Sequence, residues 1–264
     1  IATAGCNFNC KFCQNWEISQ TKPDDNYNYA LNPEQVVEMA LQTNSRSIAS
    51  TYVEPTIFAE YMIDIGILAK KRGILKVVHS NGYINAKPLD DLCASLGAAC
   101  IDLKGFTEAY YRELTEGTLQ PVLDTLVRLK QKGVHTELVT LLVPGRNDDM
   151  EQIRAMCHWI KTELSPDVPL HFSRFYPMYK LKSLPPTPVE TLEAARAAAL
   201  EEGLRYVYLG NVAGHAGEHT YCPQCGVVVI QRLGYQVKPV AFQDGRCTKC
   251  GQPIPGIWKQ PEIT

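Results

Sequence analysis

Three cysteines stand close together near the start of the chain, at Cys6, Cys10 and Cys13, in the pattern C-x3-C-x2-C. Thiolates packed this closely can hold three corners of a four-iron cluster, which normally takes one cysteine at each iron. The fourth iron would then be open to a substrate or cofactor, like the free position of a catalytic metal site.

A zinc site with a distant fourth ligand is the alternative for these three cysteines. The candidates for that ligand are Cys93, Cys100 and Cys157. All three fall in helical or apolar stretches, where a cysteine is more often a small residue of the core. The motif therefore favours the iron cluster without excluding zinc.

Four more cysteines form two C-x2-C pairs near the end of the sequence, each followed by glycine and separated by 21 residues. The ligands that this spacing predicts are Cys222, Cys225, Cys247 and Cys250. Four thiolates suit tetrahedral zinc, and a rubredoxin-like iron site uses the same geometry. Because the protein fills all four positions, we expect a closed, structural site in a small zinc-ribbon or rubredoxin-like module over residues 216–264.

Composition limits the class of protein more than it limits the reaction. The chain has 264 residues, of which 45% are hydrophobic, and its formal net charge is −2. It has no basic stripe that would indicate nucleic acid or an anionic membrane, and no apolar run that could span a bilayer. We therefore expect a globular, cytoplasmic protein. Because it opens on Ile1 rather than Met, we also expect that an N-terminal portion of the native chain is missing.

Between the two cysteine groups, strand-like and helix-like stretches alternate along the chain. The expected strands are residues 1–5, 47–53, 74–79, 98–103, 135–143, 168–175 and 205–209. The expected helices are residues 34–44, 57–72, 88–96, 121–132, 149–163 and 189–202. Such alternation predicts parallel strands joined by helical crossovers, an α/β fold over residues 1–215.

Polar residues at the ends of these strands favour a barrel over an open doubly wound sheet. Glu54, Ser80, Asn81, Lys104 and Arg174 each lie at or just past the C-terminal end of an expected strand. Barrel enzymes gather their site residues from many strand ends, whereas an open sheet uses mostly those near one switch point. We therefore predict a partial, TIM-like barrel followed by the small metal-binding module.

At this point the sequence resembles a known family. The C-x3-C-x2-C motif with Phe12 before its last cysteine is similar to that of the radical S-adenosylmethionine (SAM) enzymes. Further stretches resemble the subgroup called AmmeMemoRadiSam-system radical SAM enzymes, relatives of pyruvate formate-lyase activating enzymes. These stretches include CKFCQNWEISQ, EPTIF, NGYI, DLKGF and HFSRFYP, and the resemblance runs from Ala4 to about Gly251.

The resemblance implies a partial (β/α)6 barrel in which Cys6, Cys10 and Cys13 hold a [4Fe-4S] cluster. SAM would bind the open iron through its amino and carboxylate groups. The reduced cluster would pass one electron to the sulfonium, which splits SAM into methionine and a 5′-deoxyadenosyl radical that takes hydrogen from a substrate. The protein would contribute burial and orientation, while the cofactors carry the chemistry.

The same resemblance implies which residues hold the cofactor. Glu54 would contact the amino group of SAM, as the family's Gly-Gly-Glu-Pro motif does. Tyr52 and Val53 replace the two glycines here, so only the Glu-Pro half of the motif is kept. Ser80 and Asn81 would lie near the ribose or the carboxylate.

Other candidates lie on two further strands. Asp102 and Lys104 share one face of a strand; Asp102 would bind cofactor, and Lys104 would bind a carboxylate or phosphate unless it only forms a surface salt bridge. Either His171 or Arg174 could reach the substrate, and strand alternation puts them on opposite faces. A histidine in such a strand, His79 included, is more often hydrogen-bonded in the core.

Three functions remain open from the sequence. The first is a radical SAM enzyme acting on an unidentified small molecule or peptide. The second is an activase that installs a glycyl radical on a partner protein, and the third is a non-enzymatic iron-sulfur or zinc protein. The first two imply an electron donor such as flavodoxin or ferredoxin, and the family name implies association with Memo-like and AMMECR1-like proteins.

Overall fold

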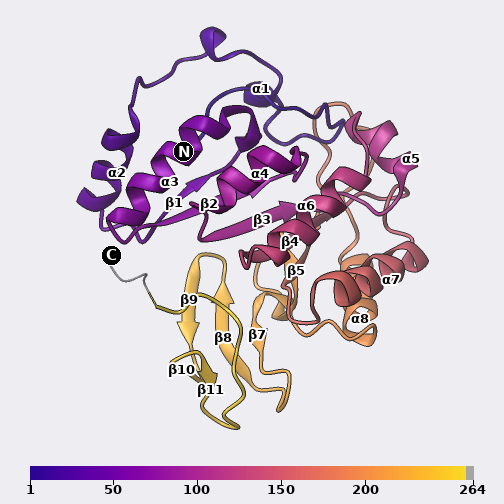
Figure 1. Cartoon of the computed structure of the whole chain (residues 1–264). Helices are drawn as coiled ribbons and strands as arrows, with labels where there is room; N and C mark the ends of the chain where they lie inside the picture. The colour runs from indigo at the N-terminus through magenta and orange to yellow at the C-terminus, as the bar shows by residue number, and fades with distance from the viewer. Residues whose placement is uncertain (260–264) are drawn as a thin grey trace.

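A sheet of six parallel strands forms the frame of the molecule (Figure 1). The computed structural model describes residues 1–259. In the sheet each strand pairs with its neighbours in the sequence. This order is that of a barrel, since a doubly wound sheet reverses its order at a switch point. The strands are β1 (Ser47–Ser50), β2 (Leu75–Ser80), β3 (Ala98–Asp102), β4 (His135–Leu142), β5 (Leu170–Arg174) and β6 (Val207–Gly210).

Helices connect the strands and cover one face of the sheet. The α-helices are α1 (Trp16–Ser19), α2 (Pro33–Gln42), α3 (Ala59–Lys71), α4 (Ala86–Cys93), α5 (Glu108–Tyr110), α6 (Gln120–Gln131), α7 (Met150–Trp159) and α8 (Val189–Glu201). Short helical turns are η1 (Pro23–Asp25), η2 (Pro55–Phe58), η3 (Tyr111–Thr115), η4 (Ile160–Leu164) and η5 (Ala216–Glu218). In residues 1–259, no helix combines the length and the apolar character that a membrane span needs.

Local sequence explains where these helices begin. Asn32 and Gln35 form a reciprocal capping box around Pro33, the first residue of α2. Asp149 caps α7 by accepting a hydrogen bond from the backbone N–H of Gln152. Side-chain oxygens at these positions satisfy amide groups that the helix itself leaves unpaired.

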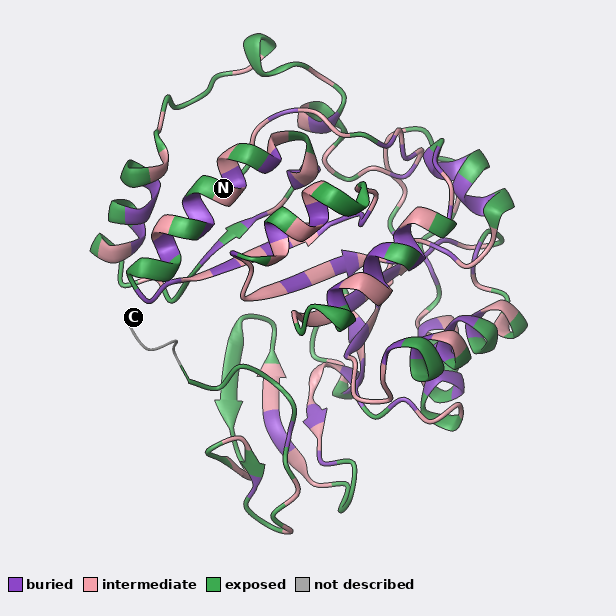
Figure 2. Ribbon diagram, in the orientation of Figure 1, coloured by how far each residue is buried: buried purple, intermediate pink, exposed green. Residues whose placement is uncertain are grey.

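Residues along the strands alternate between two environments (Figure 2). Side chains that point toward the helices are buried, as Val78, Ile101 and Phe172 show. Those on the opposite face of β2 to β6 are all intermediate in exposure. In a closed eight-stranded barrel this inner face is packed with layers of side chains. Here the six strands leave the inner face, which we call the lumen, accessible to water.

The strand expected at residues 1–5 is not formed. Only Ile1 pairs with β1, donating from its N-terminal nitrogen to Ala49 O (2.6 Å) and accepting from Thr51 N (3.1 Å). Gly5 then has φ of +102°, a left-handed conformation that ends extended pairing and starts the cysteine loop. The other expected strands and helices are present with bounds that differ by a few residues.

The C-terminal cysteines lie in a separate group of short antiparallel strands. These are β7 (Thr220–Tyr221), β8 (Val228–Leu233), β9 (Gln236–Pro239), β10 (Phe242–Gln243) and β11 (Arg246–Cys247). A small core of Tyr206, Val229, Ile230 and Ile254 packs with the cysteines. The predicted boundary after residue 215 falls between β6 and β7 and stays a prediction, and residues 260–264 of the predicted module lie outside the described residues.

Lys76 on β2 is a buried amine on the helix-facing side of the sheet, only 1% exposed. Its Nζ donates hydrogen bonds to Ser50 Oγ (2.6 Å), Val77 O (3.2 Å) and Ile48 O (3.3 Å). It has no carboxylate partner among residues 1–259. Burial lowers the pKa of Lys76 to about 7 because the charged form loses its hydration.

Replacing Lys76 by Met is expected to flatten the pH dependence of stability. The unfolded amine titrates near its ordinary pKa of about 10.4, so between about pH 7 and pH 10 the unfolded chain binds more protons than the folded one. The free energy of unfolding of the natural protein should therefore rise by up to about 1.4 kcal/mol per pH unit in that interval. Denaturant titrations of Lys76→Met across this range should lack that rise. The exposed Lys71→Met is the control, and equal slopes in all three proteins would contradict the assignment.

Candidate active site

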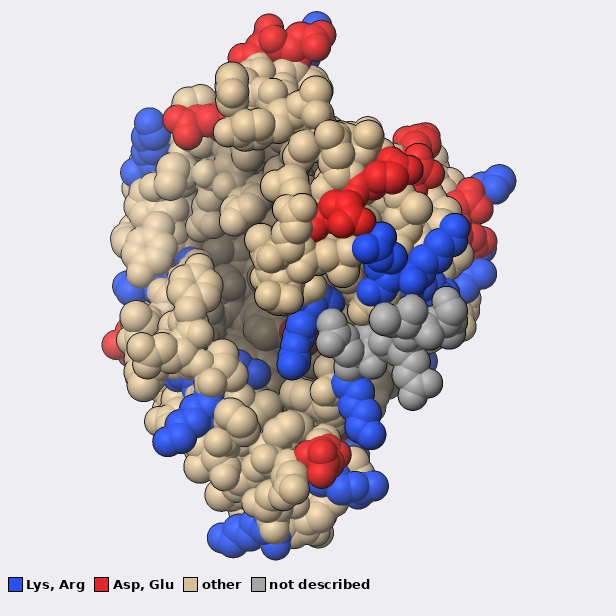
Figure 3. Space-filling model, turned by 90° about the vertical axis from the view of Figure 1, so that its left-hand side faces the viewer, with Lys and Arg blue, Asp and Glu red and all other residues tan. Residues whose placement is uncertain are grey.

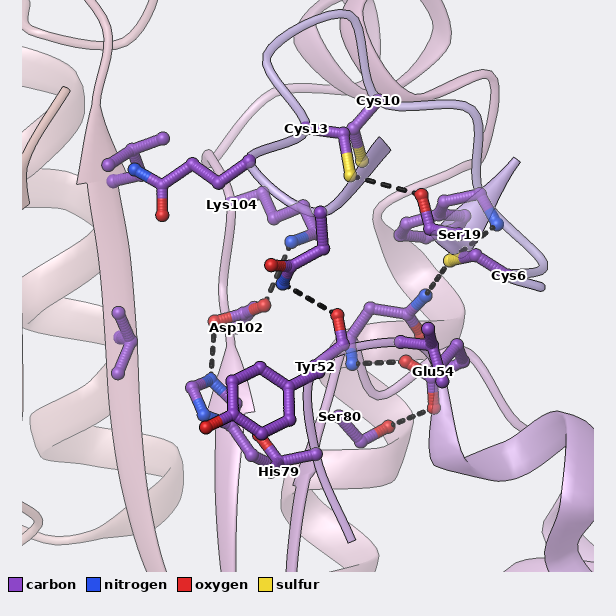
Figure 4. A pocket seen from close by; sticks show the side chains of 18 of the residues that line it. Cys6, Cys10, Cys13, Ser19, Tyr52, Glu54, His79, Ser80, Asp102 and Lys104 are labelled. Atoms are coloured by element: carbon purple, nitrogen blue, oxygen red, sulfur yellow. Dashed lines mark hydrogen bonds and ion pairs between the residues drawn. The ribbon is translucent and has the colours of Figure 1, made fainter. Parts of the chain in front are cut away.

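A cavity of about 450 Å³ lies between the cysteine loop and the C-terminal ends of the strands (Figure 4). All three N-terminal cysteines line it. The predicted residues Glu54, Ser80, Asn81, Asp102 and Lys104 line it as well. The structure thus brings two groups of predicted site residues to one cavity, although they come from four separate stretches of the chain.

Aromatic side chains fix the loop that carries the cysteines. Phe8 and Phe12 alternate with the cysteines and are only 3% and 4% exposed. Gly117 makes room for Phe8, since a Cβ there would lie 2.4 Å from the ring. Lys11 N also donates to Leu114 O (2.9 Å), which ties the loop to the segment after β3. The loop is held from beneath by packing, so its thiols can face the cavity.

The three thiols approach the cavity from different sides. Figure 4 shows Cys10 and Cys13 beside each other, with Cys6 across from them. Cys13 Sγ lies 3.2 Å from Ser19 Oγ, and Cys6 Sγ accepts a hydrogen bond from Phe8 N (3.3 Å). Burial raises the pKa of Cys6 to about 11 and that of Cys10 to about 12. These thiols lose their protons at neutral pH only when a bound metal stabilises the thiolates.

The spacing of the sulfurs distinguishes the two cysteine groups. With Zn–S bonds near 2.3 Å, tetrahedral ligands lie roughly 3.8 Å apart. The C-terminal thiols match this, with 3.5 Å between the sulfurs of Cys222 and Cys250 and 3.7 Å between those of Cys225 and Cys247. Within residues 1–259 this is the one group of three or more potential ligand atoms that all lie within 4.8 Å of one another. It fits a single tetrahedral ion.

The three N-terminal thiols form no such close group within residues 1–259. Three thiols that do not converge on one point suit a cluster that takes one cysteine at each of three irons. None of the alternative zinc ligands Cys93, Cys100 and Cys157 lines the cavity. The geometry therefore fits an iron cluster better than a zinc ion with a distant fourth ligand.

Glu54 is a buried carboxylate at the junction of β1, β2 and the cysteine loop, and it is 2% exposed. Its Oε1 accepts from Ser80 Oγ (2.7 Å) and Thr56 N (3.0 Å), while Oε2 accepts from Asn81 N (2.8 Å). Burial raises the pKa of Glu54, and these hydrogen bonds oppose that rise by favouring the ionised form. The side chain of Asn81 continues the network to Asn7 Oδ1 (2.7 Å).

Asp102 joins two cationic side chains at the floor of the cavity. Its Oδ2 accepts from Lys104 Nζ (2.9 Å), and its Oδ1 lies 3.0 Å from His79 Nε2. Burial disfavours the charge on Asp102, but Lys104 and His79 outweigh it and hold the pKa of Asp102 well below its usual range. The charge of Asp102 raises the pKa of His79, so the group carries a net positive charge at neutral pH.

His171 and Arg174 lie outside the lining of this cavity. His171 Nε2 lies 2.8 Å from Glu137 Oε2, and its ring stacks on Tyr208 at 4.8 Å. Arg174 Nε donates to Thr187 O (2.8 Å). Ser173, which stands between them on β5, lines the cavity instead. The predicted catalytic roles of His171 and Arg174 therefore gain no support from the geometry.

Further residues line the cavity without a predicted role there. Among them are Asn15, Ser19, His79 and Asn211. Asn15 and Ser19 directly follow the cysteine motif, and Asn15 Nδ2 donates to Tyr52 O (2.7 Å) across the cavity wall. His79 pairs in register with Cys100 on β3, which brings its side chain beside Asp102, and this pairing is not visible in the sequence. Asn211 directly follows β6, and the sequence predicted no role for it.

Comparison with known proteins agrees with this geometry. The family model described as the radical SAM superfamily matches residues 1–157. An uncharacterized protein of Methanocaldococcus jannaschii is 44% identical over 256 residues, which covers 96% of this chain and 76% of that protein. The pyruvate formate-lyase-activating enzyme of Listeria monocytogenes is 22% identical over 170 residues, or 60% of this chain and 67% of that enzyme.

Solved structures show the same fold at low sequence identity. The crystal structure of Streptococcus suis SuiB bound to S-adenosylmethionine superposes with a TM-score of 0.63 at 10% identity. The superposition covers 79% of this chain and 49% of that one. Likeness at this level of identity concerns the arrangement of strands and helices, and the site residues must be argued from their own geometry.

Replacing Cys247 by Ser is expected to release a single metal ion and destabilise the C-terminal module. The small core around the four thiols is too thin to stay folded without its metal. Metal analysis and thermal unfolding of Cys247→Ser should show both losses, while the iron-sulfur absorbance of the reconstituted protein stays unchanged. Cys93→Ser, which changes a cysteine outside both groups, should alter neither. A full metal content in Cys247→Ser would contradict the predicted ligand set.

Proposed function

Because this chain belongs to the radical SAM superfamily, we propose that it cleaves S-adenosylmethionine reductively and uses the resulting radical to take hydrogen from a substrate. The observation that carries this proposal is the shared cavity. The three thiols of the cysteine loop and a set of polar residues from three strand ends all line it. Iron-sulfur and SAM chemistry requires both groups to meet at one place.

Cys6, Cys10 and Cys13 would hold the [4Fe-4S] cluster. When bound, the cluster and SAM supply one-electron cleavage of the sulfonium to give methionine and a 5′-deoxyadenosyl radical. The chain itself excludes water from the cluster side of the cavity. Phe8 and Phe12 are buried directly behind the cysteines and form the apolar wall there. A wall that excludes water protects a radical from side reactions.

Polar groups of the strand ends would orient SAM. Glu54 keeps one free lone pair on Oε2 beyond its three hydrogen bonds and would accept from the amino group of SAM. Ser80 and Asn81, held by the same carboxylate, would face the ribose or carboxylate. Tyr52 stands where the family has glycine, yet its φ of +72° keeps a glycine-like backbone. This supports retention of the family's backbone contact.

Asp102 and Lys104 would bind polar groups of cofactor or substrate from the floor of the cavity. Lys104 is 14% exposed and already paired with Asp102, and its pKa is raised well above the ordinary value because that attraction outweighs the effect of burial. It therefore stays charged and can attract a carboxylate or phosphate. We assign no contact with the reacting atoms to His171 or Arg174.

Finer assignments rest on the sequence resemblance. We propose that the chain is an AmmeMemoRadiSam-system enzyme that works in the cytoplasm with Memo-like and AMMECR1-like proteins. Its electron donor would be a flavodoxin or a ferredoxin. The C-terminal module would hold zinc, with iron as the alternative, because its four thiolates leave no position open for a reactant.

Anaerobic turnover tests the proposal. The protein reconstituted with iron and sulfide, reduced with dithionite and supplied with SAM, is expected to form 5′-deoxyadenosine and methionine in equal amounts. The variant with Cys6, Cys10 and Cys13 all changed to Ala should form neither, because it cannot hold the cluster. Chromatography of the quenched reaction measures both products. A complete cluster that yields no nucleoside with any reductant would overturn the proposal.

An activase is the second candidate, favoured by the similarity to pyruvate formate-lyase-activating enzyme. An activase transfers the radical to a glycine of a partner protein, so its radical product is a polypeptide. Electron paramagnetic resonance of turnover mixtures with a partner glycyl radical enzyme should then show a glycyl radical. Deuterium transfer from a small molecule into 5′-deoxyadenosine, without a glycyl signal, would favour the first candidate instead.

A further inference from the structure

A second cavity of about 390 Å³ lies at the opposite end of the strands. It is lined by residues that begin β1, β2, β3 and β4, and by Arg232 of β8 and residues 254–258 of the C-terminal module. Figure 3 views the face toward which the N-terminal end of β3 points, and this face is hollowed at its centre. Lys and Arg side chains stand along the lower side of the hollow.

The inner face of the sheet runs from this second cavity to the active-site cavity. On β2, Val77 lines the second cavity and His79, the next residue on the same face, lines the first. On β4, Glu137 lines the second cavity and Val139 lines the first. On β3, Cys100 stands between Ala98 of the second cavity and Asp102 of the first, and it keeps intermediate exposure.

The second cavity has cationic groups that no carboxylate neutralises. Arg232 donates through Nη1 to Glu218 O (3.2 Å) and Thr220 Oγ1 (2.7 Å), and its guanidinium lies over the Tyr208 ring. Within the described part of the chain, neither Arg232 nor Arg46 forms an ion pair.

Two further groups shape the chemistry of this cavity. Glu137 lies between His171 and His135, with its Oε2 and Oε1 at 2.8 and 3.4 Å from their Nε2 atoms, so both of its oxygens already have partners. Tyr206, which lines the cavity, is 4% exposed, and its hydroxyl has no hydrogen-bond partner among residues 1–259. A buried hydroxyl without a partner is costly. A ligand that reached this hydroxyl would satisfy it.

We propose that this end of the lumen binds the oxyanion of an elongated substrate, a carboxylate or a phosphate. Arg46 and Arg232 bind the anion, since guanidinium groups form paired hydrogen bonds with both kinds of oxyanion. The rest of the substrate lies along the lumen past Cys100, so that its reacting end reaches the cysteine cavity. This assignment rests on the proposed radical function and names the class of substrate for that site.

Cys100 provides a natural reporter for the lumen. In the reconstituted holoprotein, the neutral reagent methyl methanethiosulfonate should label Cys100, and mass spectrometry of its peptide gives the rate. Millimolar glutarate or inorganic phosphate should slow that labelling severalfold relative to sodium chloride of the same ionic strength. The more protective anion identifies the oxyanion. Cys93 on α4, outside the lumen, should react at the same rate in all three solutions, and the fully buried Cys157 should not react.

Variants separate the possible outcomes. Arg46→Gln alters an exposed side chain, and Arg232→Lys keeps the charge but loses the paired hydrogen bonds; both should lose most of the protection. Arg205→Gln, which changes an arginine paired with Asp167 outside the cavity, should retain it. Unprotected labelling of Cys100, or no labelling at all, would overturn the proposal. Formation of 5′-deoxyadenosine in the same samples reports on the radical function separately, since none of these variants touches the cysteine cavity.

Discussion

The site depends most on the hydrogen bonds that the buried carboxylate of Glu54 accepts. This carboxylate lies where the chain leaves β1, and it accepts hydrogen bonds from the end of β2 and from the turn that starts η2. The backbone N–H of Glu54 donates to Gly5 O (3.4 Å) at the start of the cysteine loop. An ionised carboxylate at such depth is stable only with this full set of donors, because burial alone would neutralise it. These hydrogen bonds fix three segments relative to one another: the end of β1, the end of β2 and the start of the cysteine loop.

The network around Glu54 also helps to position the cysteine loop. At the C-terminal ends of the strands, the loop is held by Phe8 and Phe12 and by the hydrogen bond from Asn81 to Asn7, so the thiols face a cavity instead of solvent. The six strands do not close into a full barrel, and the inner face of the sheet remains open to water. The same architecture therefore gives the three thiols a shielded cavity and leaves the inner face of the sheet only partly covered.

The parts of the structure that follow local rules could be predicted from the sequence. The alternation of strands and helices and the two cysteine spacings are properties of short stretches, and the structure confirms the parallel six-stranded sheet and the four-cysteine group. The strand expected at residues 1–5 does not form. The apolar pattern that predicted it does not reveal the backbone conformation of Gly5, which ends the pairing. The resemblance, rather than periodicity, pointed to the cofactor residues.

Long-range pairing explains what the sequence could not supply. His79 joins Asp102 because β2 and β3 are neighbours with a particular register, and the side chain was expected in the core. His171 is engaged by Glu137 and Tyr208, partners on two different strands that no local pattern reveals. The second cavity arises where the C-terminal module meets the start of the strands, two regions far apart in sequence.

Mössbauer spectroscopy of the protein reconstituted with ⁵⁷Fe tests most directly whether the three thiols leave one iron open. With zinc in the C-terminal site, the iron signal comes from the cluster alone. The account predicts a four-iron cluster in which the addition of SAM changes the parameters of one iron and leaves the other three as they were. A cluster whose irons all respond alike, or do not respond to SAM at all, would contradict it.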